Sequence, residues 1–324
     1  MQSIPAPPVP DKVILIHHGA LGDFLLSWPA VLSVSRIFPY TRLYWAGSSE
    51  RLPWLEPLGL TPCPPALRRA LERIHGSTST PEELEGCRVI WPVVQKAPAV
   101  PPGLACAFLP AVTGGSSVMH AREAQLAALV AAGIPAAPDW LEAFRRFFGA
   151  KAKADGPVLL FPGAGHPAKQ WPLVHFLELA RMLEKRGRQA LMVLGPAEVE
   201  RGMSAGDAKC AAPRTLGELQ TLIASASAVV GGDTGPMHLA GMMGLPGVSL
   251  FGPTAFAQWG PVGMREISLG LPCSPCTTTC ADLECGRPGR DGPACLEGIG
   301  PDVVLEALKK AGNCKTGFQG PGIP

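Results

Sequence analysis

The chain has 324 residues, of which 47% are hydrophobic and 17% charged, and its formal net charge is +2. This length and apolar content are typical of a globular protein with two domains. The balanced charge, without a basic run or a cluster of stacking aromatic residues, argues against a nucleic-acid partner. Without a secretory signal or a run of 18 apolar residues, we expect a cytoplasmic protein with no membrane span.

The first half alternates apolar runs with a segment of helical spacing, residues 24–38. Strands are expected at Val13–Ile16, Arg42–Ala46 and Cys87–Val94. Proline-rich residues predict a loose arm over 1–10 and loops over 61–66 and 97–103. This order of strand, loop, helix and strand predicts a parallel sheet that is covered on both faces.

The second half repeats this architecture after a predicted linker over residues 148–157. Its strands are expected at Val158–Phe161, Ala190–Leu194, Ala228–Val230 and Val248–Phe251, and its helices at 171–187, 216–226, 237–243 and 302–310. We therefore expect an N-terminal domain over 1–150, a C-terminal domain over 151–312 and a disordered Gly/Pro-rich tail over 313–324. The predicted fold class is α/β, with two Rossmann-like domains facing across a cleft and ligands at the carboxyl ends of the strands.

The first strand runs into the turn "HHGALGD", residues 17–23. The glycines do not have the G-x-G-x-x-G spacing of a dinucleotide site. Asp23 falls in the first turn of the following helix, where an aspartate often caps the helix N-terminus. A carboxylate at the carboxyl end of a strand is also well placed to act as a general base.

The segment "FPGAGHPAKQWP", residues 161–172, follows the first strand of the second half. Gly163 and Gly165 expose backbone N–H groups, and Lys169 adds a compact cation, so the segment is a candidate phosphate site. It lacks the G-K-[ST] ending of a Walker loop. A simple Gly/Pro turn with a surface lysine is the alternative.

A short group of glycine and polar residues interrupts the apolar stretch "SAVVGGDTGPMHLAGMMG", residues 227–244. Asp233, Thr234 and Gly235 end a strand, and Pro236 is suited to the first turn of a helix. The positive end of that helix predicts an anion-binding turn, with His238 supporting it one turn later. A capped helix with a structural histidine is the alternative.

Glu198 follows the strand that ends at Leu194-Gly195. An acidic residue after such a strand can accept hydrogen bonds from ribose hydroxyls. A solvated surface glutamate is the alternative.

Five of the ten cysteines lie between Cys273 and Cys295. Their spacing is C273-x2-C276-x3-C280-x4-C285-x9-C295, and the first pair has the spacing of a metal knuckle. A structural iron or zinc held by Cys273, Cys276, Cys280 and Cys295 is one interpretation. Free thiols and a disulfide remain alternatives.

Together these motifs resemble glycosyltransferase family 9, the ADP-heptose:lipopolysaccharide heptosyltransferases, over residues 12–312. The start "VILIHHGALGDFLLSWPAVLSVSRIFP" is similar to the family's strand, G-x-L-G-D turn and helix. "FPGAGHPAKQWPLVHFLELA" resembles the opening of its second domain, and "LGPAEVERG" its G-x-x-E stretch. "GGDTGPMHLAGMMGLPGVSLFGPT" matches its most specific signature, D-[TS]-G-x-x-H-x-A followed by F-G-P-T.

The resemblance implies a GT-B fold that holds the donor mainly in the C-terminal domain and the acceptor in the N-terminal one. It implies that Asp23 is the catalytic base and that Lys169 neutralises the donor diphosphate. It also implies that Glu198 contacts the donor nucleoside. The loop Asp233-Thr234-Gly235, supported by His238, would hold the phosphates and sugar.

The implied activity is inverting transfer of a heptose from ADP-heptose to an inner-core lipopolysaccharide acceptor, without a divalent metal. The enzyme would meet that acceptor by peripheral contact on the cytosolic face of the inner membrane. Two alternatives stay open. One is a transferase that uses another nucleotide sugar or a protein acceptor, and the other is a non-catalytic protein that binds nucleotide sugars.

Two features depart from the family pattern. Relatives often carry Lys or Arg six residues before the base, where this chain has His17. This change suggests weaker binding of an anionic acceptor or a different acceptor. His17 and Gly22, which precedes the base, are the predicted acceptor-side residues. Related autotransporter heptosyltransferases carry a cysteine-ligated iron near the cysteine cluster, but the spacing in this chain does not match that site.

Overall fold

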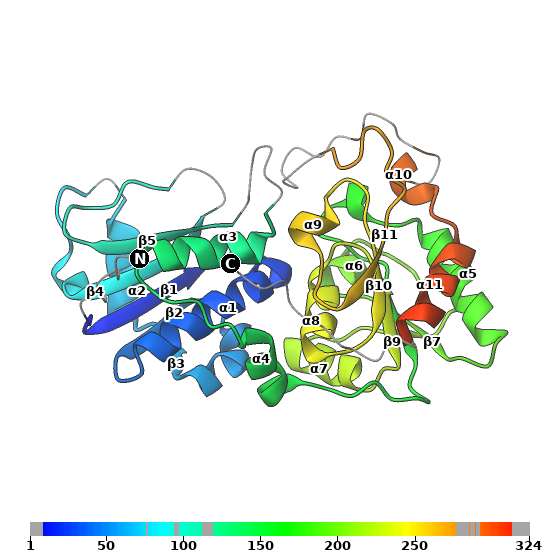
Figure 1. Ribbon diagram of the computed structural model, residues 1–324, viewed down its shortest axis with the longest axis horizontal. Coiled ribbons are helices and arrows are strands. Elements are labelled where there is room, and N and C mark those ends of the chain that lie inside the picture. The colour runs from blue at the N-terminus through cyan, green and yellow to red at the C-terminus, as the bar shows by residue number, and fades with distance from the viewer. Residues whose placement is uncertain are drawn as a thin grey trace. The chain divides into compact units, whose positions relative to one another are not determined.

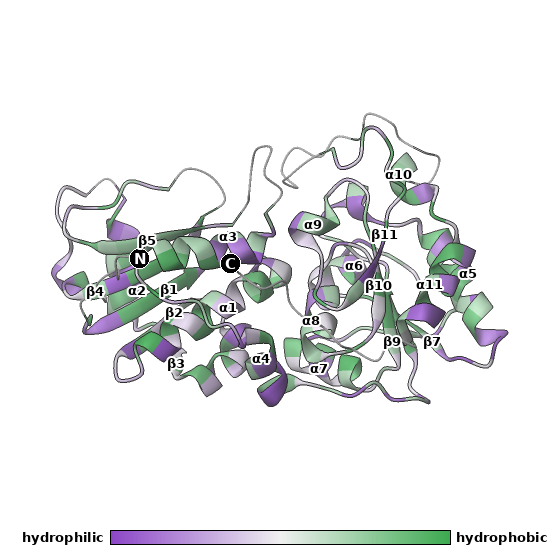
Figure 2. Cartoon of the chain, in the orientation of Figure 1, coloured by the Kyte–Doolittle hydropathy of each residue, from purple (hydrophilic) through white to green (hydrophobic). Residues whose placement is uncertain are grey.

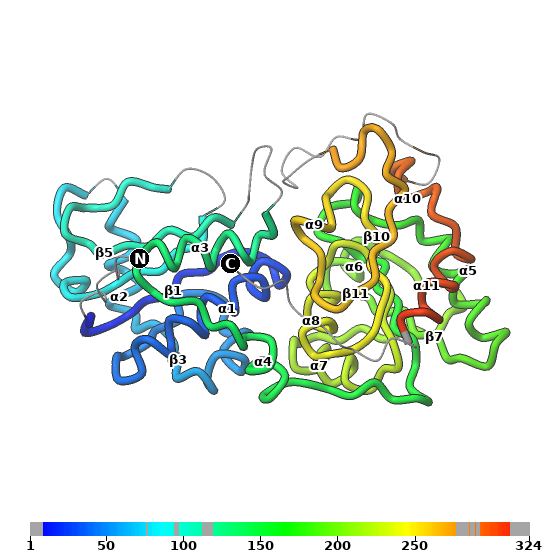
Figure 3. Tube along the Cα trace, in the orientation of Figure 1, coloured from blue at the N-terminus to red at the C-terminus, as the bar shows by residue number. Residues whose placement is uncertain are grey.

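The structure is a computed structural model that describes residues 9–75, 77–93, 97–111, 119–276, 285, 289 and 292–312. It divides into two compact units, Met1–Ala143 and Phe144–Pro324, which are described separately below. Helix α4 (Trp140–Phe148) spans this division, as the chain trace shows (Figure 3). The tail predicted over residues 313–324 lies outside the described residues.

The first unit is built on a parallel sheet, which contains five strands among the described residues. They are β1 (Lys12–His17), β2 (Arg42–Gly47), β3 (Leu60–Pro62), β4 (Cys87–Val93) and β5 (Ala105–Pro110), in the order β3-β2-β1-β4-β5. The order reverses between β1 and β4, so the turn after β1 lies at the topological switch point. Open α/β sheets bind ligands at this position.

Helices cover both faces of the first sheet (Figure 1). On one face, Ile14 and Ile16 of β1 pack with Leu67 and Leu71 of α2 (Pro65–Arg73). Helix α1 (Leu21–Ile37) follows β1 directly and packs against α3 (Ala121–Ala131). Shorter helical segments are η1 (Ser49–Trp54), η2 (Glu56–Leu58) and η3 (Glu82–Leu84).

One predicted loop of the first unit is wrong in part. Residues 61–66 were expected to be a loop because of their prolines, yet Leu60–Pro62 forms β3 and α2 begins at Pro65. Strand β3 lies at the edge of the sheet, where a proline removes no hydrogen bond from a second neighbour. Proline is also tolerated at the start of a helix.

The second unit also contains a parallel sheet, with six strands among the described residues. They are β6 (Val158–Phe161), β7 (Ala190–Val193), β8 (Cys210–Ala211), β9 (Ala228–Gly231), β10 (Gly247–Leu250) and β11 (Met264–Ile267), in the order β11-β10-β9-β6-β7-β8. Counted within this unit, that order is 6-5-4-1-2-3, which is the strand order of a dinucleotide-binding fold. The switch point therefore lies between β6 and β9.

The second sheet lies between two groups of helices (Figure 1). Helices α5 (Leu173–Glu184) and α11 (Pro301–Gly312) lie on one side, and α7 (Leu216–Ala224) and α8 (Gly235–Met243) on the other. The remaining helical segments are α6 (Pro196–Glu200), α9 (Phe256–Trp259), α10 (Ala294–Glu297) and η4 (Pro167–Lys169).

The second sheet is strongly apolar. Strands β6, β9 and β10 are buried along their whole length. Helix α4, which is not part of this sheet, carries hydrophilic residues (Figure 2). Such continuous apolar runs are typical of parallel strands that are covered on both faces. The predicted α/β class, with a parallel sheet in each half, is confirmed.

Candidate functional site

The turn after β1 places Asp23 at the border between buried and accessible residues. Asp23 is the third residue of α1 and is half-buried, as is Gly22 beside it. Its Oδ2 atom accepts a hydrogen bond from the backbone N–H of Ala20 at 3.0 Å. Asp23 thus caps the helix N-terminus from the third helix position, whereas the N-cap residue itself is Ala20. This position leaves the carboxylate at the carboxyl end of a central strand, where a base would be needed.

His17, the last residue of β1, lies inside the unit with 4% of its surface exposed. Its Nδ1 atom lies 3.0 Å from Nη1 of Arg51, a buried residue of η1. Burial, and to a lesser extent the Arg51 charge, lower the pKa of His17 to about 4. His17 is therefore neutral near pH 7 and does not supply the cation that relatives carry at this position. Arg51 was not predicted as a site residue.

In the second unit, the loop after β6 meets the loop after β7. The Glu198 side chain lies against Gly163, so that a Cβ built on Gly163 would come within 2.3 Å of the glutamate carboxyl group. Only a glycine allows this close approach. Oε2 of Glu198 also accepts the backbone N–H of Gly195 at 2.9 Å, which fixes the carboxylate at the start of α6. Gly165 is exposed, and a Cβ there would meet nothing within 4 Å.

The loops after β6 and β9 meet through an ion pair. Nζ of Lys169 lies 2.8 Å from Oδ2 of Asp233, and the two side chains are 9% and 12% exposed. The same Oδ2 accepts a hydrogen bond from the hydroxyl of Thr254 at 3.0 Å. Lys169 is therefore not the surface lysine of the alternative interpretation. It is held in a buried cluster of three residues, Lys169, Asp233 and Thr254, which we call the donor cluster.

The turn after β9 leads into α8, whose N-terminus is half-buried. Thr234 is the N-cap residue, and its side chain caps none of the helix N–H groups in the part of the chain that the structure describes. Gly235 opens the helix and Pro236 follows it, as predicted. His238 is buried with 5% of its surface exposed, which agrees with a supporting role for this loop.

These residues come from four neighbouring strands of one sheet. The order β10-β9-β6-β7 brings together the segments that follow the four strands, which carry Thr254, Asp233, Lys169 and Glu198. Phe161 at the end of β6 pairs with Gly231 at the end of β9, so these two strands end level with each other. A cation, two carboxylates and a helix N-terminus thus lie together at the carboxyl ends of the central strands of this sheet.

Sequence reasoning missed two residues that the structure brings to these positions. Thr254 ends the F-G-P-T segment after β10, and its place after a strand in that motif was a usable signal. Arg51 lies 34 residues from His17 in a segment without a recognisable motif. No local pattern pointed to its contact with the turn after β1.

The described cysteines do not support the predicted iron or zinc site. Within the described ranges, no group of three or more His, Cys, Asp or Glu side chains could hold a metal ion. Cys273 and Cys276 are exposed, whereas Cys295 is buried and its pKa is raised to about 11 by burial and by neighbouring thiols. All described cysteines are free thiols, and Cys280 lies outside the described residues.

The cysteine-bearing segment instead contacts the loop after β10. The backbone N–H of Cys276 donates to the carbonyl of Pro253 at 3.0 Å, and the hydroxyl of Ser274 donates to the carbonyl of Gly252. Gly252 and Pro253 lead directly to Thr254 of the donor cluster. The segment thus supports that loop through its backbone.

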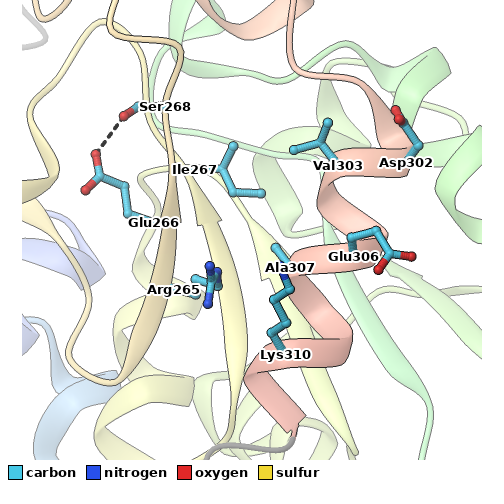
Figure 4. A pocket seen from close by; sticks show the side chains of 9 residues that line it. All are labelled: Arg265, Glu266, Ile267, Ser268, Asp302, Val303, Glu306, Ala307 and Lys310. Atoms are coloured by element: carbon cyan, nitrogen blue, oxygen red, sulfur yellow. Dashed lines mark hydrogen bonds between the residues drawn. The ribbon is translucent and has the colours of Figure 1, made fainter.

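A hollow of about 530 Å³ lies elsewhere in the second unit, between β11 and α11 (Figure 4). Charged side chains such as Arg265, Glu306 and Lys310 line it, and Glu266 accepts a hydrogen bond from Ser268. None of the predicted site residues lines this hollow. We therefore assign the candidate site to the strand ends and not to this hollow.

Comparison with known proteins identifies the family. The sequence model of glycosyltransferase family 9 (heptosyltransferase) matches residues 118–285, slightly more than half of the chain. The chain belongs to glycosyltransferase family 9. The matched region contains Lys169, Glu198, Asp233 and His238, but ends before Cys295 and begins after Asp23.

A curated relative of this family 9 chain is lipopolysaccharide heptosyltransferase 1 of Pseudomonas aeruginosa. The two are 34% identical over 175 residues, which are 49% of this chain and 49% of the relative. The chain thus spans about half the length of that relative in the match.

Solved structures agree with the fold over nearly the whole chain. The structure of Escherichia coli ADP-heptose lipopolysaccharide heptosyltransferase II aligns with a TM-score of 0.60 and 18% identity, covering 93% of this chain and 98% of that one. The iron-containing dodecameric glycosyltransferase TibC of enterotoxigenic E. coli H10407 aligns with a TM-score of 0.62 and 16% identity. It covers 94% of this chain and 77% of that one. These likenesses confirm the GT-B fold class.

No helix in the described part of the chain combines the length and the apolar character that crossing a membrane requires.

Proposed function

We propose that this chain is an inverting glycosyltransferase that moves a heptose from ADP-heptose to an inner-core lipopolysaccharide acceptor. Family membership and the named heptosyltransferases that the chain resembles support this activity. The donor cluster carries the proposal, because it places one buried cation and a helix N-terminus at the end of a parallel sheet, where a diphosphate would bind.

On the donor side, Lys169 and the N-terminus of α8 balance the charge of the ADP diphosphate. Asp233 holds the Lys169 ammonium group in place, and the Thr254 hydroxyl holds the Asp233 carboxylate. Glu198 lies across Gly163, where its carboxylate accepts hydrogen bonds from the donor nucleoside. His238 and Thr234 support the loop that contacts the phosphates and the sugar.

In the proposed reaction, Asp23 removes a proton from an acceptor hydroxyl. The resulting oxygen attacks the anomeric carbon while the bond from that carbon to the diphosphate oxygen breaks, which inverts the anomeric configuration. ADP leaves with the electron pair, and its growing negative charge is stabilised by Lys169 and the helix dipole. No cofactor is needed for these steps.

We further propose that the enzyme works in the cytoplasm and reaches a membrane-embedded acceptor by peripheral contact with the inner membrane. This location follows from the proposed acceptor. Flotation of the protein with lipopolysaccharide-containing vesicles would test the contact.

The deciding experiment is product detection by mass spectrometry. Purified protein is mixed with ADP-heptose and a Kdo-containing lipid A acceptor, with Lys169→Ala and Lys309→Ala run in parallel. Lys309 pairs with exposed Glu306, so its variant controls for loss of a lysine far from the donor cluster. We expect a heptose-sized mass gain with wild type and Lys309→Ala, and none with Lys169→Ala.

Other outcomes separate the alternatives. Slow ADP release without a mass gain would keep the donor and exclude this acceptor. Activity with a different nucleotide sugar in a donor panel would replace ADP-heptose. Tight ADP binding without any turnover would indicate a protein that only binds nucleotide sugars.

A further inference from the structure

Arg51 is a buried cation that the proposed reaction does not use. It lies in η1, directly after β2, and only 8% of the residue is exposed. Its Nη1 atom lies 3.0 Å from Nδ1 of His17, and its Nη2 atom donates to the carbonyl of Gly19 at 2.6 Å. Both ends of the guanidinium fork thus hold the turn that leads to Asp23.

Aromatic rings hold this arginine in a narrow range of positions. Its guanidinium carbon lies 5.2 Å from the centre of the Phe24 ring, which allows a cation–π contact. The His17 ring stacks on Trp45 with centroids 6.0 Å apart and meets Phe24 edge-on at 5.9 Å. A cation fixed in this way can set the geometry of its neighbours, because it has little freedom to move itself.

Gly19 joins the arginine to the carboxylate. A Cβ built on Gly19 would lie 2.9 Å from Oδ2 of Asp23 and 3.0 Å from Cε1 of His17. The carboxylate and the imidazole therefore pack against the same side of Gly19, while Arg51 binds its carbonyl oxygen. This crowding requires a glycine and leaves the carboxylate one defined place.

The charges around this turn are few. Burial lowers the pKa of Arg51, and the charges of Asp23 and Glu50 raise it. The other titratable neighbours are His17, whose pKa is lowered mainly by burial and also by the Arg51 charge, and His18, whose charge also lowers the pKa of His17. Among the described residues, Arg51 is thus a cation whose charge interacts favourably with that of Asp23.

We propose that Arg51 is a positioning residue that fixes the turn before Asp23 and keeps its carboxylate charged. This role rests on the proposed function of Asp23 as the base. Arg51 itself does not contact the acceptor, because both of its terminal nitrogens face groups of the turn. The cation next to the base therefore comes from η1 and not from β1.

The test compares Arg51→Gln and Arg51→Lys with wild type, using the full chain. Arg73→Gln serves as the control, because Arg73 is exposed and pairs with Glu83. A nearby opposite charge favours the ionised form of a carboxyl group and so lowers its pKa. In Arg51→Gln we expect the acid limb of the kcat/KM profile to move up by about one pH unit.

Arg51→Lys keeps the charge but loses the two-pronged contact with the turn. Its acid limb should stay at the wild-type pH, whereas kcat should fall about ten- to a hundredfold through misplacement of the carboxylate, with KM unchanged. Wild-type kcat in Arg51→Lys, or an unmoved acid limb in folded Arg51→Gln, would overturn the proposal. If Arg51→Gln does not fold, the lysine variant alone decides.

A readout without turnover separates this inference from the proposed function. Carbon-13 NMR follows the titration of the Asp23 carboxyl, which is assigned by its loss in Asp23→Asn. We expect that titration to move to higher pH in Arg51→Gln and to stay in place in Arg73→Gln. If it moves in a protein that transfers no heptose, the coupling stands and the proposed reaction fails. If transfer occurs and the titration does not move, the coupling fails.

Discussion

The turn after β1 and the loops after β6 and β9 occupy the same place in two sheets of similar strand order, but they hold charge differently. In the first unit, the half-buried carboxylate of Asp23 caps the N-terminus of its own helix by accepting the Ala20 N–H, and the buried Arg51 lies near it. In the second unit, the Lys169 ammonium group and the Asp233 carboxylate form a direct ion pair. We propose that the first arrangement serves proton transfer and that the second holds a cation in place for anion binding.

These two arrangements suit two different proposed roles, a general base and a phosphate site, at equivalent positions of two similar sheets. A general base must keep one carboxylate oxygen accessible to the substrate. The groups that hold it should therefore be backbone N–H groups and charges that do not cover that oxygen. A phosphate site must hold a lysine rigidly, so the Lys169 ammonium group donates to the Asp233 carboxylate, and the Thr254 hydroxyl donates to the same carboxylate oxygen.

Asp23→Asn should abolish most of the activity and leave the donor side intact. We expect turnover to fall by about 10²- to 10⁴-fold, which is the usual contribution of a general base, with ADP affinity unchanged. The asparagine oxygen can still accept the Ala20 N–H, so stability should change little. Initial rates and ADP calorimetry are the measurements.

Asp155→Asn is the matched control, because Asp155 is an exposed residue of the second unit. It should keep wild-type turnover. If Asp23→Asn also keeps its turnover, Asp23 is not the base and the contrast between the two regions has no catalytic meaning.

Lys169→Met should destabilise the second unit by about 3 kcal/mol, because it leaves the carboxylate of Asp233 buried without its ion-pair partner. Thr254 still donates to that carboxylate and limits the loss. Urea unfolding of the variant and of Lys309→Met gives the comparison. The exposed Lys309–Glu306 pair should contribute little to stability, because solvent screens its charges.

The double variant Lys169→Met with Asp233→Asn separates stability from binding. It removes both charges, so the free energy of unfolding should return most of the way to wild type. ADP affinity should stay low, because the cation is missing. Recovery of ADP affinity in this double variant would show that Lys169 serves the fold alone.

His17 should make stability depend on pH in the acid range. Burial lowers its pKa from 6.5 to about 4, so between these values the unfolded chain binds more protons than the folded one. The stabilisation is complete above pH 6.5 and is lost as the pH falls toward 4, by about 3 kcal/mol at most. Thermal unfolding from pH 7 to pH 4 measures this slope.

His17→Asn should flatten this part of the stability profile, since its amide oxygen can face Arg51 without titrating. His18→Asn is the control, because His18 is exposed, and it should keep the wild-type slope. An unchanged slope in His17→Asn would mean that other groups cause the acid sensitivity.

The candidate residues at the strand ends could be predicted from the sequence, because the residues of each motif are close neighbours in the chain. Glycines, an acid or a lysine directly after an apolar run located Asp23, Lys169 and Asp233, and the structure places all three where strands end. Edge strands were harder, since prolines in Leu60–Pro62 suggested a loop. Propensity cannot tell an edge from a break in the sheet.

Contacts between residues that are distant in the chain could not be predicted from the sequence. Arg51 reaches His17 across 34 residues, and the pairing of Lys169 with Asp233 spans 64. Each contact exists only because β1 neighbours β2 and β6 neighbours β9 in the folded sheets. The knuckle spacing of Cys273 and Cys276 predicted a metal site for which the described residues supply no group of three or more ligands, because local spacing alone does not bring further ligands together.

Gly163→Ala should show the smallest effect and the most specific one. A methyl group there meets the Glu198 carboxyl, the movable end of a flexible side chain, so the side chain shifts and the fold survives. We expect ADP affinity to fall about tenfold and the variant to couple with Glu198→Ala by about 1 kcal/mol. ADP calorimetry on the two single variants and the double variant measures this coupling.

Gly165→Ala sharpens the result, because a methyl group at Gly165 meets no protein atom within 4 Å. Any loss of ADP affinity in this variant must come from the ligand itself, so it should add to that of Glu198→Ala without coupling. Coupling at Gly163 alone would mean that the glycine is there to let Glu198 reach the nucleoside. Equal coupling at both glycines would instead make the whole loop, and not this one contact, the element that holds the donor.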